Sequence, residues 1–351
     1  MNLNDGIHYN WQKTLSYDAD ITMVVGAPNK GKTYGIRGYA ICNRFLKTGR
    51  KLVEVCRHKN TRDAIKGNYL DKLIANDPAL KGYDFRCSRN EFFLKSPGGK
   101  WESCGYIVSM VEMQGVKQRT FADVETIIMD EAIIEAIDKW HRYLPREWDI
   151  LTRIVDSCVR EQLDGEGVRP HVYLLGNAVD VLNPYFQTFG IKGVPPYGYS
   201  WHLNKTALLH YVEPDAADTR RRDETLAGRM GAVTGYTDAT YANRFEVDDR
   251  YIAKKPKRAK FVMGVRAYGS TYGIWADLTE GIYYVTGKCP EGDARVYSLT
   301  REDDSPNLIA ARKTTKPLKG VVDFYYAGAV LFESVRIREG FLDAMRMFGL
   351  R

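Results

Sequence analysis

The sequence has no closely paired cysteines and no long apolar run, and these absences exclude several classes of protein. Its six cysteines are scattered, and none forms the C-x-x-C pair that is typical of structural zinc sites, so neither zinc nor disulfides are implied. No run of about 18 apolar residues is present, so we expect no membrane-spanning helix. The N-terminal residues lack the basic-then-apolar design of a secretory signal. We therefore expect a protein of a reducing cytoplasm.

Internal repeats and low-complexity linkers are also missing, whereas apolar and charged residues are abundant. Of 351 residues, 44% are hydrophobic and 27% are charged, which suits folded cores and excludes a disordered chain. The length predicts one large domain with a second one, or two to three modules. The net charge of +7 and the pI near 8.9 fit a phosphate-bearing partner but do not require one.

The most informative motif is G-x-x-x-x-G-K-[ST] at residues 26–33, which is typical of phosphate-binding loops. An apolar, β-branched run precedes it and a helix-compatible stretch follows, which is the order that this motif requires. We expect Lys32 to reach the β- and γ-phosphates of ATP and the Thr33 hydroxyl to hold Mg²⁺. An ordinary glycine turn is the alternative. The predicted nucleotide-binding residues here are Gly26, Ala27, Pro28, Asn29, Lys30, Gly31, Lys32, Thr33 and Tyr34.

A second motif is an apolar strand at residues 124–129 that ends in two carboxylates, Asp130 and Glu131. In P-loop enzymes an acid at this position binds Mg²⁺, and we assign this role to Asp130. Glu131 is predicted to orient and deprotonate the attacking water. A solvated turn is the alternative for an isolated acid pair, but the P-loop favours catalysis. A strand at residues 106–110 lies between the two motifs along the chain, which suits P-loop ATPases that add a strand and use a catalytic glutamate.

Four further residues are candidates for the same site. Arg160 follows a predicted helix and is a candidate arginine finger for a neighbouring subunit, with a solvated surface arginine as the alternative. Asn177 follows an apolar strand and is predicted to sense the γ-phosphate, with a turn asparagine as the alternative. Tyr9 and Gln12 are predicted to hold adenine by stacking and by bidentate hydrogen bonding.

Strands alternate with helical stretches in the first half of the chain, which predicts an α/β fold whose parallel-core sheet is covered on both faces. The second half predicts a smaller α+β domain. In it, residues 261–268, 272–277 and 281–286 read as a three-stranded meander, and residues 324–348 read as a helix. The predicted boundaries are residues 1–197 for a P-loop ATPase domain, 198–230 for a linker and 231–351 for the C-terminal domain.

Together these motifs resemble those of the DNA-packaging ATPases of phi29-type small tailed phages. The segments that carry the resemblance are residues 9–13, 15–18, 43–45, 55–59, 130–131, 176–186 and 272–277, and GNAVDVLNPYF at 176–186 is the most specific. The resemblance implies a ring ATPase, a homopentamer, that uses ATP and Mg²⁺ to pump double-stranded DNA through a portal into a preformed capsid. It also implies a place in the host cytoplasm, with transient docking on the prohead, and it leaves a structural RNA open as a partner.

By the same resemblance, Lys117 reaches the ATP of a neighbouring subunit and the C-terminal domain has an RNase H-like fold. In related terminases this fold cuts DNA with clustered acids on its first strand and nearby. The expected first strand here, residues 261–266, carries no acid, so we expect a vestigial nuclease that does not cleave DNA. Asp277 and Asp323 are the acids that remain.

Basic residues after the predicted strands are candidates for contact with the DNA backbone, which a translocating motor grips in preference to bases. They are Arg57, Lys59, Arg62 and Lys139. A basic run at residues 254–260 is a further candidate for DNA, RNA or the portal, and a solvated face is equally compatible with it.

Two other functions stay open. One is a different nucleic-acid-translocating ATPase, of the helicase or DNA-partitioning type, although no helicase-type downstream motif is present. The other is a non-enzymatic assembly protein with a decayed P-loop. The intact Lys32, Thr33, Asp130 and Glu131 argue against decay.

Overall fold

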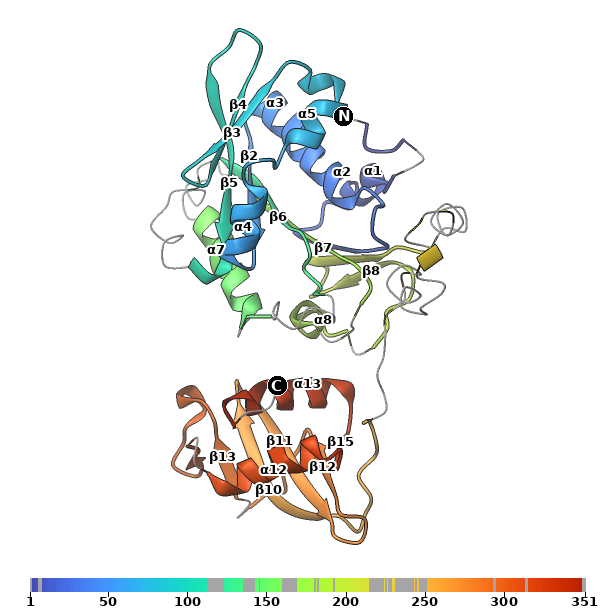
Figure 1. Ribbon diagram of the computed structural model, residues 1–351, viewed down its shortest axis with the longest axis vertical. Helices are drawn as coiled ribbons and strands as arrows, with labels where there is room; N and C mark the ends of the chain where they lie inside the picture. Colours follow the sequence, from blue (N-terminus) through green and yellow to red (C-terminus); the bar gives the residue numbers. More distant parts are fainter. Residues whose placement is uncertain are drawn as a thin grey trace. The chain divides into compact units, whose positions relative to one another are not determined.

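The chain forms two compact units, residues 1–246 and 247–351 (Figure 1). The computed structural model describes residues 2–5, 8–112, 121, 123–134, 143–144, 146–159, 169–179, 181, 183–191, 193–214, 224, 226, 229–230, 243, 245, 251–292, 295–312 and 315–348. Within these residues no helix is long and apolar enough to cross a membrane.

The first unit is built on a nine-stranded sheet with the order β3-β4-β5-β2-β6-β7-β1-β9-β8. Neighbouring strands run parallel from β5 to β9, whereas β3, β4 and β8 are antiparallel additions at the two ends. The predicted parallel-core α/β fold is therefore confirmed. The strands are β1 Ile21–Val25, β2 Lys51–Cys56, β3 Asp84–Ser88, β4 Glu91–Lys95, β5 Trp101–Ser109, β6 Val124–Met129, β7 His171–Gly176, β8 Gly198–His202 and β9 Ala207–Tyr211.

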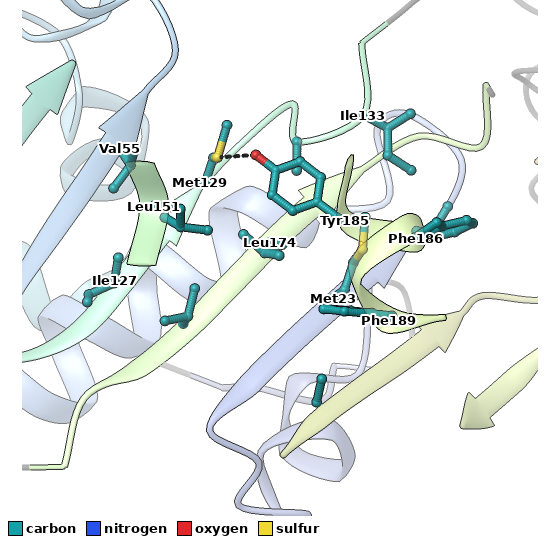
Figure 2. Close-up of a cluster of buried hydrophobic side chains, with 14 of the residues drawn as sticks. Met23, Val55, Ile127, Met129, Ile133, Leu151, Leu174, Tyr185, Phe186 and Phe189 are labelled. Carbon is teal, nitrogen blue, oxygen red and sulfur yellow. Dashed lines mark hydrogen bonds between the residues drawn. The ribbon is translucent and has the colours of Figure 1, made fainter. Parts of the chain in front are cut away.

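Helices cover both faces of this sheet, because successive side chains of each central strand point to opposite faces. On β6, Ile127 and Met129 pack with residues of α7 and α8, whereas Ile128 packs with residues of α2, η1 and α5. Figure 2 shows the first of these clusters, in which the Tyr185 hydroxyl donates to the Met129 sulfur at 3.1 Å. The helices are α1 Trp11–Leu15, α2 Lys32–Gly38, the π-helical η1 Tyr39–Phe45, α3 Leu46–Thr48, α4 Lys59–Ile65, α5 Asp71–Asn76, α7 Glu147–Val159 and α8 Pro184–Phe189, with short 3₁₀ turns η2 Pro78–Leu80 and η3 Met110–Glu112.

The structure differs from the sequence-based expectations about this sheet at two points. The strand that separates the two nucleotide motifs in space is β7, which pairs with both β1 and β6. Residues 106–109 instead end β5, which pairs with the far side of β2, and Met110 begins η3. The predicted linker, residues 198–230, begins too early, because β8 and β9 are hydrogen-bonded into the sheet. The apolar side chains of β9 are buried against the core, and this burial outweighs the glycine- and proline-rich stretch before β8.

The second unit contains a six-stranded sheet with the order β14-β13-β10-β11-β12-β15. Strands β10, β11 and β12 form the predicted antiparallel meander, β13 is parallel to β10, and β14 is parallel to β13. This arrangement is that of RNase H-like folds. The elements are β10 Lys260–Ala267, β11 Ser270–Asp277, β12 Ile282–Thr286, β13 Val296–Ser298, η5 Arg301–Asp303, β14 Ile309–Ala310, α12 Lys316–Tyr326, β15 Val330–Phe332, α13 Val335–Met345 and η6 Arg346–Phe348.

The predicted continuous helix at residues 324–348 is wrong. Helix α12 ends at Tyr326, and Gly328 adopts a left-handed backbone conformation with φ of 73°. The chain then forms β15, which pairs in parallel with β12 and buries Val330 and Phe332. A helical apolar pattern and a short buried strand cannot be told apart from a few apolar residues.

Candidate nucleotide site

The phosphate-binding loop connects β1 to α2, as the motif predicts. Gly31 has φ of 73°, a left-handed conformation that favours glycine, and a Cβ there would lie 2.9 Å from the His8 ring. The N-terminal segment supports the loop from outside. The backbone N–H of Tyr9 donates to the Lys30 carbonyl at 2.8 Å, and the Trp11 indole N–H donates to the Lys32 carbonyl at 2.9 Å. The loop is therefore held by residues before β1 as well as by its own turn.

Lys32 is buried at the centre of the site, with 7% of its surface exposed. Its ammonium donates to the carbonyls of Gly26 and Ala27, both at 2.7 Å, and to Oδ1 of Asn177 at 3.2 Å. Burial lowers the pKa of Lys32 to about 8, against the opposing attraction of Asp130. The predicted P-loop lysine and the predicted sensor asparagine are thus in direct contact.

Asp130 and Glu131 follow β6 at the same edge of the sheet. Glu131 has φ of 54°, and its backbone N–H donates to Oδ1 of Asp130 at 3.0 Å. The Glu131 side chain is exposed, whereas Asp130 is half-buried. Since β7 lies between β1 and β6, the carboxyl ends of all three strands bring Lys32, Asn177 and Asp130 together. This is the edge at which ligands bind in open α/β sheets.

The two residues predicted to contact adenine, Tyr9 and Gln12, differ in exposure. Tyr9 is buried, and its ring packs against Trp11 and His210, with centroids 4.9 and 5.4 Å away. Its hydroxyl lies 2.6 Å from both Thr14 Oγ1 and His210 Nδ1. Tyr9 therefore belongs to the support of the loop, and the predicted stacking on adenine is corrected. Gln12 is exposed on α1, and its contact with adenine stays a prediction.

Two of the predicted DNA contacts are buried, and we correct both. Arg57 is 8% exposed and forms an ion pair with Glu147 at 2.8 Å. Arg62 is also 8% exposed and is paired with Asp63 and Glu112. Their guanidinium groups are buried and paired with carboxylates within the fold.

Lys59 keeps an exposed side chain, although its ammonium lies 2.8 Å from Glu112. Three other predicted residues, Lys117, Lys139 and Arg160, lie outside the described residues, so their roles stay predictions.

Sequence reasoning missed two supports of the site. Trp11 packs so closely on the P-loop helix that a Cβ on Gly35 would lie 2.3 Å from its ring. The signal was a glycine inside a predicted helix. Arg37 on α2 lies 4.0 Å from Oδ2 of Asp130 and 2.7 Å from Oε1 of Glu54. There the signal was a carboxylate, Glu54, within an apolar strand.

Several known proteins are similar to this chain over nearly its whole length. The curated DNA packaging protein of Bacillus phage PZA is 30% identical over 340 residues, which cover 96% of each chain, and that of Bacillus phage phi29 is 29% identical with the same coverage. The solved phi29 viral genome packaging motor assembly matches with a TM-score of 0.67 at 25% identity, over 97% of this chain and 99% of that one.

The fold and the site define a P-loop nucleotide-binding protein with an additional strand between its two nucleotide motifs. Residues 3–347 match the Podovirus DNA encapsidation protein (Gp16) family, and the chain belongs to this family. The resemblance to phi29-type packaging proteins is thereby confirmed.

Proposed function

We propose that this chain is an ATPase subunit of a motor that drives double-stranded DNA through a portal into a preformed capsid. The observation that carries the proposal is the convergence of the P-loop, Asn177 and the Asp130–Glu131 pair at one edge of the sheet, inside a DNA encapsidation family. Two neutral backbone carbonyls, of Gly26 and Ala27, and the amide oxygen of Asn177 accept from Lys32. A phosphate oxygen is a stronger acceptor, since charge-assisted hydrogen bonds are the stronger ones.

The residues present fit Mg²⁺, because a hydroxyl at Thr33 and a carboxylate at Asp130 are hard oxygen ligands. When bound, the ion neutralises charge on the phosphates. Glu131, exposed beside Asp130, accepts a proton from the attacking water. Asn177 contacts Lys32 directly, so it is suited to report phosphate binding to β7 and to the segment that leads to α8.

Within a homopentameric ring, Arg160 and Lys117 act on the nucleotide of the neighbouring subunit. Arg160 directly follows α7, whose first residue, Glu147, is anchored to Arg57. The ring works in the host cytoplasm and docks transiently on the prohead. Lys59 and Lys139 are the DNA-backbone contacts that remain from the predicted set.

Two variants test the proposal. Lys32→Ala should abolish ATP binding and hydrolysis, whereas Glu131→Gln should bind ATP and fail to hydrolyse it. Titration with a fluorescent ATP analogue measures ATP binding by each variant, and the rate of phosphate release measures hydrolysis. Normal turnover by Glu131→Gln would remove it from the role of base. A second assay separates packaging from unwinding: packaged DNA should be protected from added nuclease only when both ATP and proheads are present.

The action between subunits has its own test. Arg160→Ala and Glu131→Gln subunits are each expected to be inactive alone. In mixed rings, some interfaces pair an intact arginine with an intact glutamate, so hydrolysis should partly return. Absence of recovery in rings whose mixed composition is confirmed by native mass spectrometry contradicts an arginine finger at this position.

A further inference from the structure

Glu54 is a buried carboxylate in the middle of the sheet. It lies on β2, between β5 and β6, with 1% of its surface exposed. A buried ionised group costs several kcal/mol unless it is paired and hydrogen-bonded. Two groups supply the pairing: Arg37 Nη2 donates to Oε1 at 2.7 Å, and the Tyr69 hydroxyl donates to Oε2. Glu54 is therefore the anchor of a small buried network.

Arg37 connects this network to the nucleotide site. It lies on α2, one helical turn after Thr33. Its guanidinium carbon lies 4.2 Å from the centroid of the Tyr69 ring, and Nη2 lies 4.0 Å from Oδ2 of Asp130. The nitrogen that donates to Glu54 is thus the one that lies near Asp130, while the Tyr69 ring packs against the guanidinium.

The distance to Asp130 is informative. At 4.0 Å the contact is too long for a hydrogen bond, yet short enough for a strong attraction in a partly buried site. Burial by itself lowers the pKa of Arg37, but Glu54, Tyr69 and Asp130 together raise it above its ordinary value. The guanidinium therefore stays charged beside Asp130 without binding its oxygens.

We propose that Arg37 is a positioning residue for Asp130, and that Glu54 and Tyr69 hold its guanidinium back so that Asp130 keeps an oxygen for Mg²⁺. The inference rests on the proposed function, in which Asp130 is the acid on the Mg²⁺ side. Without Glu54, Arg37 is free to form a bidentate ion pair with Asp130, and a metal ion must then displace it. Glu54 acts through Arg37 and touches no reactant.

The test is the enhancement of nucleotide affinity by Mg²⁺, measured on the full chain. The Kd of a fluorescent ATP analogue is determined with Mg²⁺ and with EDTA, and the ratio of the two is compared between variants. Glu54→Gln should reduce this ratio about tenfold, the size of one strong ionic hydrogen bond, and leave the Kd in EDTA unchanged. Tyr69→Phe should reduce the ratio less, because Arg37 keeps its pairing with Glu54.

The double variant Arg37→Met/Glu54→Gln separates positioning from mere support of the fold. It removes the residue that blocks Asp130, so the Mg²⁺ ratio should recover relative to Glu54→Gln alone. A purely structural role predicts a ratio no better than that of the single variant, and this result would overturn the inference.

A matched control lies two turns further along the same helical segment. Arg44 on η1 pairs with Glu125 on β6, at 2.9 Å from Nε to Oε2, in a second ion pair between helix and strand. Glu125→Gln should leave the Mg²⁺ ratio unchanged. Asp130→Asn, in the same assay, tests the proposed function. If it keeps the Mg²⁺ enhancement, the assignment of Asp130 fails. If it loses the enhancement while Glu54→Gln behaves like Glu125→Gln, only the role of Arg37 fails.

Discussion

Arg57 and Glu147 form a bidentate ion pair in the interior of the first unit. Arg57 Nε lies 2.8 Å from Oε2 of Glu147, and Nη2 lies 2.8 Å from Oε1. The remaining guanidinium donors reach the carbonyls of Glu131 at 3.2 Å and Ala132 at 3.0 Å, and the Tyr185 hydroxyl donates to Glu147 at 2.6 Å. The pair therefore fixes the backbone around the predicted catalytic glutamate to the start of α7 and to α8.

Arg57→Ala should lower the free energy of unfolding by about 3–5 kcal/mol, because it leaves Glu147 buried without its charged partner. Urea denaturation monitored by tryptophan fluorescence measures this. Lys59→Ala is the matched control, since Lys59 is exposed, and its effect should stay within about 0.5 kcal/mol. If Arg57→Ala keeps wild-type stability and loses salt-dependent DNA binding, Arg57 is a DNA contact and not a buried structural residue.

Gly35→Ala should destabilise the P-loop helix even though alanine favours helices. The new Cβ would lie 2.3 Å from the Trp11 ring, and Trp11 cannot move without breaking its hydrogen bond to the Lys32 carbonyl. Overpacking of this kind typically costs about 1–3 kcal/mol, which exceeds the gain in helix propensity of about 1 kcal/mol. We expect a lower unfolding midpoint and a weaker affinity for ATP.

Gly67→Ala serves as the control for this substitution, because its Cβ would meet no atom within 4 Å. It should change neither stability nor ATP affinity measurably. If the two substitutions have equal effects, the close contact between Trp11 and Gly35 does not determine the cost of Gly35→Ala.

The sequence predicted those parts of the site that depend on neighbours along the chain. The P-loop, the acid pair after β6 and Asn177 each follow an apolar strand directly, and parallel strands bring their carboxyl ends to one edge. The structure adds the contact between Lys32 and Asn177, which depends on β7 lying between β1 and β6. The local hydrophobic pattern of a sequence can identify a strand, but it does not determine which strands become neighbours in the sheet.

The prediction that the basic segment after β2 contacts DNA fails at Arg57 and Arg62 for a related reason. Arg57 and Arg62 resemble an exposed basic patch in the sequence, but their carboxylate partners, Glu147 and Glu112, lie far away along the chain. Burial of an arginine is decided by such distant partners, which no window of neighbouring residues contains.

Asp277 should act as a structural residue of the second unit and not as a nuclease ligand. Its Oδ2 accepts from Arg258 at 2.7 Å, and its Oδ1 accepts from the backbone N–H groups of Thr279 and Glu280 at 3.1 and 3.4 Å. The hydrogen bond from Arg258 lowers the pKa of Asp277, so the carboxylate stabilises the fold above its ordinary pKa of about 4 and loses this effect at lower pH.

Asp277→Asn should therefore lower the thermal midpoint of the second unit near neutral pH, and the difference from wild type should shrink in acid. Incubation of the full chain with plasmid and Mn²⁺ should leave the DNA intact in both proteins. Metal-dependent nicking that disappears in Asp277→Asn would make the chain a nuclease as well.

His210 makes the stability of the first unit depend on pH. Burial, and then the charge of Lys13, lower the pKa of His210 to about 4. Its ring stacks on Tyr199 with centroids 3.7 Å apart, and its Nδ1 lies 2.6 Å from the Tyr9 hydroxyl, next to the backbone that supports the P-loop. The folded protein thus holds His210 neutral under conditions in which the unfolded chain binds a proton.

An unfolded histidine has a pKa of about 6.5, so between about pH 6.5 and pH 4 the unfolded state binds more protons than the folded state. Stability from this residue is complete above about pH 6.5 and is lost as the pH falls toward 4. His210→Gln, which still accepts from Tyr9 and does not titrate, should flatten this loss. Urea midpoints at about pH 7 and about pH 5 measure it, and His202, present in both proteins, cancels in the comparison. An equal loss of stability in wild type and His210→Gln would show that acid acts on the protein elsewhere.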